Sequence, residues 1–395
     1  MIMVSVEKAL ELINENTNKL GSETLGIEKC LGRVLAMDVF SKVDIPGFPQ
    51  SAMDGYAVNA LQDIAEGDSF KLIGEVQAGY SKEIEIIPGQ AVRIFTGAVV
   101  PKGSTTVVMQ EVVTFKDGVI TVNKAVVDGA NIRAQGEQIV SGDTGLQEGT
   151  VLTPSGIGFL AMMGYSKVKV FKKPVIHLVV TGNELVSPGE ELSYGQIYES
   201  NSVTLVAALE NYGFPVAKIH FVNDTYNETL SCLQLSMNEC DLLITSGGIS
   251  VGDYDFVGRA LKDLEVKEHF YKVKQKPGKP LFFGSYKKTL IFALPGNPAS
   301  SLTSLYYYIL PVLNKMIGKG FQGLKSNQVP LNGDYLKKGD RAQFLKGFLT
   351  NEGVEVLDGQ SSAMLHTFAI TNALVFIPEN VFVVKDKELV TVLYL

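Results

Sequence analysis

Residues 241–256 read DLLITSGGISVGDYDF, a strand-length apolar run that is followed by a glycine pair and two aspartates. The apolar run predicts a buried strand, and the glycines leave bare backbone N–H groups that can approach a phosphate. A glycine turn that caps a helix is the alternative interpretation of this segment alone. The predicted anion contacts are Gly247, Gly248 and Ser250, and the carboxylates are Asp253 and Asp255.

Strands and helices alternate on both sides of this stretch, from residue 173 to residue 323. The other predicted strands are VIHLVVT (175–181), VAKIHFV (216–222), EHFYKVK (268–274), LFFGS (281–285) and LIFAL (290–294). The predicted helices are residues 201–213, 227–239, 256–264 and 299–318. This alternation predicts βαβ units and a mostly parallel sheet that is covered by helices on both faces.

The rest of the chain has a different pattern of apolar and turn residues. Residues 4–20 have the apolar spacing of an amphipathic helix, and TPSGIGFLAMMG (153–164) predicts a second helix with Thr153 as its cap. Between them, residues 44–143 are short β-rich runs separated by Gly, Pro and Asp turns, which predicts an all-β insertion. After residue 323 short β-like runs suggest a small terminal barrel. The predicted fold class is therefore multidomain, α/β plus β.

Composition argues against several classes of protein. The 35 basic and 42 acidic residues give a net charge of −7, whereas general nucleic-acid binding needs a basic footprint. The cysteines Cys30, Cys232 and Cys240 form no CxxC pair and the four histidines lie far apart, so we expect reduced thiols and no zinc cage. The sequence has neither the apolar core of a signal peptide nor a membrane-length apolar stretch, so we expect a cytoplasmic protein without membrane contact.

Two further loops carry residues that suit an anion. KQKPGKP (274–280) gathers lysines around a Pro-Gly-Pro frame, which in an acidic protein indicates a local oxyanion site, with a solvated turn as the alternative. IFALPGNPASS (291–301) predicts a strand, a turn and a helix start with Pro298 at the first helical position. The candidate residues of the two loops are Lys274, Lys276 and Lys279, with Lys272 just before them, and Asn297, Ser300 and Ser301. We expect all three loops to converge on one pocket at the carboxyl edge of the sheet.

Acidic side chains recur at the predicted loops. The candidates are Asp54, Glu184, Asp224 and Asp255. Separated carboxylates beside a phosphate cradle suggest a hard cation such as Mg²⁺, which prefers oxygen ligands. A capping or surface role is the alternative for any one of them.

Eight segments together give the chain a family resemblance. They are PGFPQSAMDGYAV (46–58), RIFTGAVVPKGSTTVVMQE (93–111), NIRAQGEQI (131–139), TGNEL (181–185), GQIYESN (195–201), TSGGISVGDYD (245–255), KPGKPLFFG (276–284) and LPGNPASS (294–301). In this order they resemble the molybdopterin molybdenumtransferase family, called MoeA in bacteria and the gephyrin E domain in animals. QFLKGFL (343–349) and GQSSAMLHTFAITNALVFIP (359–378) resemble the last domain of that family, so the resemblance runs essentially end to end.

The resemblance implies four domains and a homodimer. They would be an elongated helical dimerisation domain (1–43 and 144–172), an inserted β domain (44–143), an α/β domain like the molybdopterin adenylyltransferase MogA, with three layers (173–323), and a C-terminal β-barrel (324–395). The implied site lies between the α/β domain of one subunit and the inserted domain of the other.

The implied reaction inserts molybdate into adenylylated molybdopterin and releases AMP with Mg²⁺ as cofactor. The motif-matched positions are Asp54, Thr96, Glu184, Asp224, Asp255, Lys272, Lys276, Lys279, Pro295 and Pro298. Within this scheme Glu184, Asp224 and Asp255 would hold the metal. The glycine pair, Ser250 and Asn201 would contact the adenylyl phosphates. Molybdate would be cradled by Lys276, Lys279, Ser300, Arg341 and Ser361. A transient contact with the adenylyltransferase that makes the substrate is also expected.

The chain departs from the family pattern at three places. Gln138 follows Gly136-Glu137 where an acid is usual, Asn183 replaces the acid of TGDEL, and Lys346 replaces the arginine of F-x-R-G. A lysine cannot make the bidentate contacts of an arginine. An acid at the Gln138 position is counted among the family's functional residues, so we expect these changes to affect affinity more than activity.

Other functions are compatible with parts of the sequence. Adenylylation of molybdopterin uses the same α/β domain but would leave residues 1–170 and 325–395 unexplained. A scaffold is a second alternative, since the animal homologue clusters receptors, but no fused partner domain or long linker is present here. A competence/damage-type protein would share only the α/β domain, and SAMDGYA (51–57) argues against it.

Overall fold

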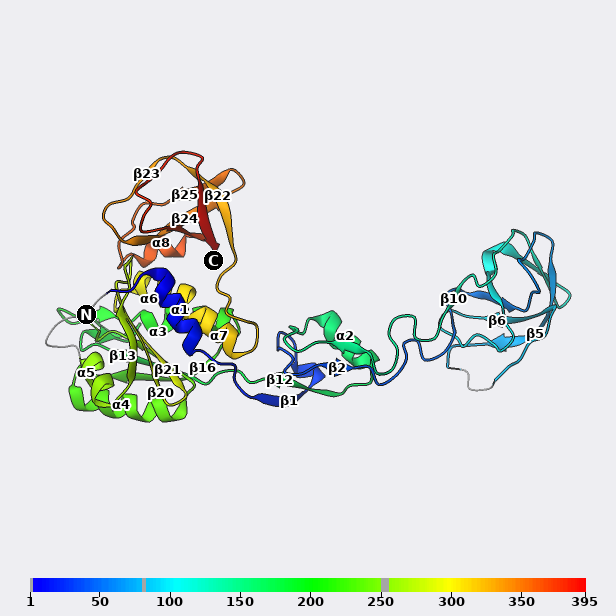
Figure 1. Cartoon of the computed structure of the whole chain (residues 1–395), viewed down its shortest axis with the longest axis horizontal. Coiled ribbons are helices and arrows are strands. Elements are labelled where there is room, and N and C mark those ends of the chain that lie inside the picture. Colours follow the sequence, from blue (N-terminus) through cyan, green and yellow to red (C-terminus); the bar gives the residue numbers. More distant parts are fainter. Residues whose placement is uncertain (1–2, 80–82, 250–255) are drawn as a thin grey trace. The chain divides into compact units, whose positions relative to one another are not determined.

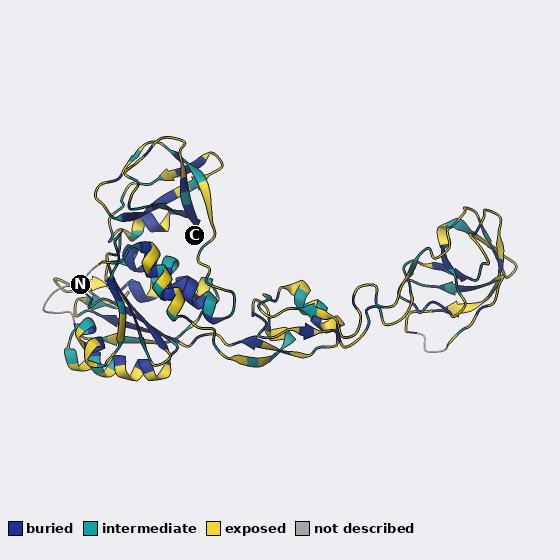
Figure 2. Cartoon of the chain, in the orientation of Figure 1, coloured by how far each residue is buried: buried dark blue, intermediate teal, exposed yellow. Residues whose placement is uncertain are grey.

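The computed structural model describes residues 3–79, 83–249 and 256–395. The chain forms two compact units (Figure 1). The first contains the N-terminal residues up to Glu23 together with Phe171–Leu395, and the second is Thr24–Val170. Each unit has apolar cores of its own, which Figure 2 shows as dark blue strands and helix faces.

A six-stranded sheet with the order β16-β13-β17-β21-β20-β18 forms the centre of the first unit. Strands β16, β13, β17 and β21 are parallel, whereas β20 is antiparallel to both β21 and β18. The bounds are β13 Ile176–Thr181, β16 Val216–Val222, β17 Leu242–Ser246, β18 Lys267–Lys272, β20 Pro280–Tyr286 and β21 Thr289–Leu294. Every residue of β13, β17 and β21 is buried, as expected for strands covered on both faces. The predicted mostly parallel sheet is confirmed.

Helices cover both faces of this sheet (Figure 1). Helices α4 (Tyr226–Glu239) and α5 (Phe256–Asp263) share one core with the sheet, in which Leu233, Val257 and Ile291 are fully buried. On the other face, α3 (Asn201–Asn211) packs against α6 (Pro298–Ser304). A short parallel pair, β14 (Leu185–Val186) and β15 (Ile197–Tyr198), lies between β13 and α3 in the sequence.

The long helix predicted over residues 299–318 is interrupted. Helix α6 is followed by a π-helical turn, Leu305–Ile309, and then by α7 (Leu310–Met316). Pro311 lies just after the π turn, and a proline cannot donate the backbone hydrogen bond of a regular α-helix. This gives a physical reason for the interruption.

The C-terminal part of the first unit is a closed five-stranded barrel. Its strands pair in the order β24-β25-β22-β28-β26, and β26 pairs back onto β24. The bounds are β22 Ser326–Asn332, β24 Ala342–Thr350, β25 Gly353–Val356, β26 Ala373–Ile377 and β28 Leu389–Tyr394, with β23 (Tyr335–Leu336), β27 (Val383–Val384) and α8 (Leu365–Ala369) between them. Residues 274–280, which we call the lysine loop, contain strand β19 (Gln275–Lys276). This strand pairs in parallel with β24. The predicted barrel is therefore confirmed, and its edge is joined to the lysine loop.

The second unit contains a six-stranded sheet with the order β7-β4-β6-β5-β9-β8. These strands are β4 Gly55–Val58, β5 Ser69–Val76, β6 Gln90–Ile94, β7 Thr106–Met109, β8 Val113–Lys116 and β9 Val119–Val122. A smaller core surrounds α2 (Pro154–Met162), whose cap Thr153 accepts a hydrogen bond from the N–H of Gly156 at 3.2 Å. Short pairs complete the chain: β1 (Ser22–Gly26) with β12 (Lys167–Phe171), β2 (Val39–Phe40) with β11 (Thr144–Leu146), and β3 (Gln50–Ser51) with β10 (Ile132–Arg133).

Helix α1 (Val6–Asn16) belongs to the first unit, whereas the domain division from the sequence grouped it with residues 144–172. Its flanks are hydrogen-bonded to the α/β part: the Val4 N–H donates to the Lys272 carbonyl at 3.0 Å, and the Leu20 N–H donates to the Met316 carbonyl at 2.8 Å. An amphipathic pattern gives a buried face but not the surface that covers it. The four-domain division stays a prediction.

None of the helices in the described part of the chain has the length and apolar character needed to cross a bilayer.

Candidate functional site

Two adjoining cavities lie at the carboxyl end of the parallel sheet. The first has a volume of about 610 Å³ and is lined by the loops that follow β13, β16, β17 and β21. The second has a volume of about 590 Å³ and is lined by the lysine loop, the start of α6 and residues of the barrel. Pro280, Pro295 and Asn297 line both cavities. The sequence predicted one pocket, whereas the Gly247 loop lines the first cavity, the Lys276 loop lines the second, and the Pro295 loop lines both.

Two of the predicted acids line the first cavity. Glu184 follows β13 and Asp224 follows β16, so neighbouring parallel strands bring them to one edge. The Asp224 N–H donates to Oδ1 of Asn183 at 2.9 Å. An amide oxygen accepts this bond as a carboxylate would, which explains how Asn183 can replace the usual acid.

The glycine pair also lines the first cavity, in a backbone conformation that other residues rarely adopt. Gly247 has φ 93° and Gly248 has φ 64°. A Cβ on Gly247 would lie 2.6 Å from the Thr181 carbonyl oxygen, and one on Gly248 would lie 2.6 Å from Cγ2 of Val257. Only glycine fits this approach to β13 and α5, so the loop presents bare backbone to the cavity.

Asn201 links two loops of the first cavity. Its Nδ2 donates to Oγ of Ser246 and to the carbonyl of Gly296, each at 2.8 Å. Oδ1 of Asn201 and the Thr181 hydroxyl are buried and have no hydrogen-bond partner among the described residues. Such groups are costly unless a ligand or water satisfies them, which is consistent with a polar ligand in this cavity.

Several residues that line the cavities were not predicted from the sequence. They are Thr181, Ser246 and Glu199 in the first cavity and Gln360 and Ser362 in the second. Glu199 is buried and accepts hydrogen bonds from the N–H and hydroxyl of Ser202, so it also caps α3. Thr181 and Ser246 are the last residues of predicted strands, a position that could have identified them.

The second cavity is lined by the cations and hydroxyls predicted for an oxyanion. Lys276, Lys279, Ser300, Arg341 and Ser361 all contribute. Both lysines are exposed, and neither has an ion pair in the ranges that the structure describes. Nη1 of Arg341 donates to the Gln275 carbonyl at 3.2 Å, which holds the barrel against the lysine loop. Cations from two parts of the fold therefore face one space.

Two buried side-chain hydrogen bonds hold the lysine loop in place. Tyr308, in the π-helical turn, donates its hydroxyl hydrogen bond to Oε1 of Gln275, and both side chains are fully buried. Nε2 of Gln275 then donates to the Gly278 carbonyl at 3.1 Å. Burial raises the pKa of Tyr308 well above its ordinary value, so the phenol stays protonated and remains a donor.

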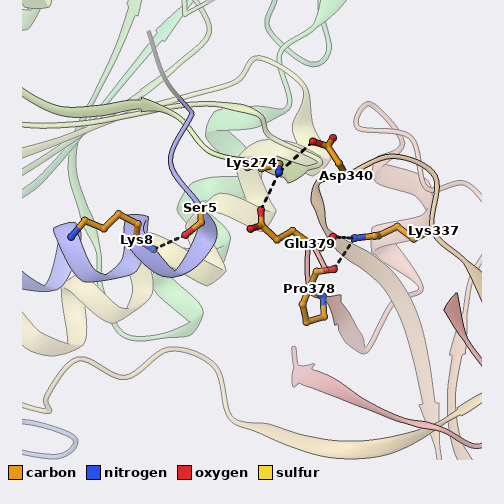
Figure 3. A network of polar contacts seen from close by, with 7 residues as sticks. All are labelled: Ser5, Lys8, Lys274, Lys337, Asp340, Pro378 and Glu379. Atoms are coloured by element: carbon orange, nitrogen blue, oxygen red, sulfur yellow. Dashed lines mark hydrogen bonds and ion pairs between the residues drawn. The ribbon is translucent and has the colours of Figure 1, made fainter. Parts of the chain in front are cut away.

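An ion-pair network joins the start of this loop to the barrel (Figure 3). Lys274 Nζ lies 3.3 Å from Asp340 and 3.5 Å from Glu379. The hydrogen bond that Lys274 donates to Asp340, together with the charge of Glu379, raises the pKa of Lys274, and the same bond lowers the pKa of Asp340. The ammonium of Lys337 donates to the carbonyls of Pro378 and Glu379, each at 2.7 Å. Lys274, predicted as an anion contact, is therefore engaged with acids of the barrel.

Asp54 and Thr96 form an acidic turn in the second unit. The N–H and hydroxyl of Thr96 donate to Oδ1 of Asp54 at 2.7 and 2.9 Å. These two bonds, the backbone one first, lower the pKa of Asp54. Arg93 stacks between Tyr56 and Phe95 and donates to the Gly55 carbonyl at 3.2 Å, so it supports the turn. The carboxylate is thus held ionised on a rigid turn.

Some predicted residues do not line either cavity. Lys272 lies at the end of β18, where its carbonyl accepts from Val4. Gln138 is exposed in the second unit and its N–H donates to the Ile45 carbonyl at 2.9 Å. Ser250, Asp253 and Asp255 fall outside the described residues. Within residues 3–79, 83–249 and 256–395, no three His, Cys, Asp or Glu side chains group closely enough to hold a metal ion by themselves.

Comparisons with known proteins place the chain in a family. The family "MoeA N-terminal region (domain I and II)" matches residues 4–164, "Probable molybdopterin binding domain" matches 177–315, and "MoeA C-terminal region (domain IV)" matches 328–395. The molybdopterin molybdenumtransferase of Haemophilus influenzae is 33% identical over 93% of this chain and 90% of that protein. The corresponding protein of Staphylococcus epidermidis is 30% identical over 99% of this chain and 95% of its own length.

A solved structure agrees with these matches. The crystal structure of the molybdopterin biosynthesis MoeA protein from Pyrococcus horikoshii has a TM-score of 0.85 and 29% identity, with 100% of both chains covered. Fold and site together define a multidomain protein of the MoeA type. The chain belongs to the molybdopterin molybdenumtransferase family, whose curated members are transferases of molybdenum cofactor biosynthesis. The fold class and the family predicted from the sequence are confirmed.

Proposed function

We propose that this chain inserts molybdate into adenylylated molybdopterin and releases AMP. The observation that carries the proposal is the pair of adjoining cavities, one with carboxylates and a glycine loop, the other with two lysines and an arginine. In the reaction, molybdate exchanges oxygen ligands, which leave as water with the thiol protons, for the two dithiolene sulfurs, and water hydrolyses the phosphoanhydride bond so that AMP leaves. One cavity would then hold the phosphates and the other the oxyanion.

The first cavity suits the adenylyl phosphates. The glycine loop offers backbone N–H groups without side chains in the way, and Asn201 is fixed beside it by its bonds to Ser246 and Gly296. The unpaired hydroxyl of Thr181 adds a hydrogen-bonding group beneath the loop. These residues would orient the phosphoanhydride rather than react with it.

The residues of the first cavity also fit a magnesium ion. Mg²⁺ is commonly held by one or two carboxylates together with substrate phosphates, and Glu184 and Asp224 line the same space as the unpaired Thr181 hydroxyl. We propose these two acids, with Asp255 as a third, as its protein ligands. The ion would supply positive charge to the phosphoryl oxygens.

The second cavity suits molybdate, a tetrahedral dianion. Lys276 and Lys279 are exposed and free to turn toward it, whereas Arg341 is fixed by its bond to Gln275. The hydroxyls of Ser300 and Ser361 complete a set of donors of the kind that oxyanions require. Charge stabilisation and positioning would account for most of the rate enhancement.

The working enzyme is proposed to be a cytoplasmic homodimer in which Asp54 and Thr96 complete the site of the partner subunit. Complementation tests this arrangement. Asp54→Ala and Lys276→Ala subunits are mixed and allowed to exchange. If each site uses both subunits, half of the dimers are mixed and each has one intact site, so about a quarter of the wild-type rate returns. No recovery after proven exchange would show that Asp54 acts within its own subunit.

The proposed transient contact with the adenylyltransferase would be tested by cross-linking of the two proteins.

The reaction itself is tested by AMP release. The purified protein with adenylylated molybdopterin and Mg²⁺ should release AMP only when molybdate is added. Asp224→Ala and Lys276→Ala should each lower the rate by about 100-fold or more, because each removes a charge from the site. Glu210→Ala and Lys288→Ala are matched controls, since both residues are exposed and lie outside the cavities. Undiminished AMP release in both site variants would refute the assignment, and ATP-dependent adenylylation instead would favour the adenylyltransferase activity.

A further inference from the structure

Lys346 is a buried lysine that is hydrogen-bonded to a loop of the second cavity and that the proposed mechanism does not use. It lies on β24 with 3% of its surface exposed. Its ammonium donates to the carbonyls of Gly359, Ser361 and Met364 at 2.7, 3.1 and 3.1 Å. All three acceptors belong to residues 359–364, which we call the barrel loop.

The three bonds favour one protonation state of this side chain. A lysine ammonium has three N–H donors, whereas the neutral amine has two and a lone pair that would face a carbonyl oxygen. Three carbonyl acceptors therefore favour the charged form, whereas burial lowers the pKa of Lys346. In the described part of the chain, no carboxylate forms an ion pair with Lys346. A buried positive charge thus lies next to the barrel loop, without an ion-pair partner among the described residues.

The barrel loop connects this charge to the cavity. Gln360, Ser361 and Ser362 line the second cavity, and Ala363 lines the first. Gln360 exchanges two hydrogen bonds with the backbone of Lys346, at 2.9 and 2.8 Å. From the other side, Nδ2 of Asn297 donates to Oγ of Ser362 at 3.1 Å. The loop is therefore held between Lys346 and the start of α6.

We propose that Lys346 is a positioning residue that makes the second cavity selective for a tetrahedral dianion over a monoanion of the same shape. It orders the barrel loop that presents Ser361, and a bound dianion supplies the counter-charge that no carboxylate of the described residues provides. A charge interacts twice as strongly with a dianion as with a monoanion at the same distance, so the selectivity follows from electrostatics. This inference rests on the proposed function in that molybdate is the natural ligand.

Molybdate and perrhenate provide the test, because both are tetrahedral oxyanions of similar size and they carry two and one negative charges. Binding of each is measured by isothermal titration calorimetry, without any pterin. In the wild type molybdate should bind more tightly than perrhenate. Lys346→Gln keeps two donors but removes the charge, and it should lower the ratio of the two affinities by roughly tenfold. Lys346→Arg should keep the ratio close to that of the wild type.

Two further measurements separate charge from folding. Gln360→Leu loosens the barrel loop without changing charge, so it should weaken both anions and leave their ratio unchanged. AMP affinity reports on the first cavity and should not change in Lys346→Gln. An unchanged ratio in folded Lys346→Gln, or an equal loss of the ratio in Gln360→Leu, would overturn the inference. Failure of molybdate-dependent AMP release would instead refute the proposed function while leaving this anion selectivity in place.

Discussion

The two cavities share an edge but are built in different ways. The first is made almost entirely by loops that follow consecutive parallel strands, so the sheet topology alone brings Glu184, Asp224 and the glycine pair together. The second takes its lysines from the α/β part and Arg341 and Ser361 from the barrel. The first cavity therefore depends on backbone geometry at strand ends, and the second depends on the contacts that hold two parts of the first unit together.

Those contacts are few and can be named. Strand β19 pairs with β24 through Gln275 and Lys276, Tyr308 supports Gln275 from below, and Lys274 forms ion pairs with the barrel. If the two cavities are built separately, substitutions in one should spare ligand binding in the other.

The largest effect that is confined to one cavity is expected from Gly247→Ala. The new Cβ would lie 2.6 Å from the Thr181 carbonyl at φ 93°, so the glycine loop must move. We expect AMP affinity to fall by about 100-fold, because small displacements at a positioned phosphate are costly, with molybdate affinity unchanged. Calorimetric titration with each ligand measures this.

Gly158→Ala is the control for the glycine substitution. Gly158 lies within α2, where an added Cβ would meet nothing within 4 Å, and it should raise stability by about 0.5 to 1 kcal/mol. Equal losses of AMP and molybdate affinity in Gly247→Ala would mean that the cavities are not separate.

A smaller effect, on the second cavity, is expected from Tyr308→Phe. Loss of the hydroxyl leaves Oε1 of the buried Gln275 unpaired, which should cost about 1 to 3 kcal/mol of unfolding free energy. The lysine loop above it should loosen, so molybdate affinity falls while AMP affinity is retained. Urea unfolding and calorimetry test both parts. Tyr286→Phe is the matched control, since Tyr286 lies at the end of β20 away from the lysine loop, and the ammonium of Lys287 lies over its ring. The same molybdate loss in the control would contradict the proposed support.

The acidic turn of the second unit should respond to pH. Thr96→Val removes the hydroxyl bond to Asp54 but keeps the N–H bond, so the pKa of Asp54 should rise and still stay below its ordinary value of 3.8. When the pKa of a carboxyl is lower in the folded state than in the unfolded state, its ionised form stabilises the fold at pH values above the unfolded pKa. This contribution is lost as the pH falls through the folded pKa. The stability difference between variant and wild type should therefore be present at neutral pH and disappear in acid. Titration of the Asp54 carboxyl by ¹³C NMR measures the shift, and an unchanged titration would contradict the role of Thr96.

The smallest effect is expected from Lys274→Met. Lys274 is about one third exposed, with a side-chain exposure of 32%, and its partner Asp340 is 76% exposed, so solvent screens the network in Figure 3. Molybdate affinity should change by less than about twofold, and the difference should vanish at high salt. Titrations at low and high ionic strength test this. A large, salt-independent loss would mean that the network is essential to the second cavity.

The difference between the cavities also explains what the sequence could predict. Apolar runs followed by Gly247, Asp224 or Pro295 identify strand ends, and strand ends of a parallel sheet share an edge. Arg341 and Ser361 were identified only by the family resemblance, because no local pattern indicates that a barrel residue faces the lysine loop. Lys272 was predicted to be functional because it precedes the lysine loop, but it does not line either cavity. The sequence identified Lys346 only as the replacement for the family's arginine, because its contacts with three carbonyls of residues 359–364 depend on the folded barrel.

A crystal grown with both AMP and molybdate, with diffraction measured at the molybdenum absorption edge, tests the central claim most directly. The account predicts an anomalous peak in the second cavity within hydrogen-bond distance of Lys276, Lys279 and Arg341, together with AMP beside Gly247 and Asn201 in the first. A molybdenum peak in the first cavity, or AMP displaced whenever molybdate is bound, would contradict it.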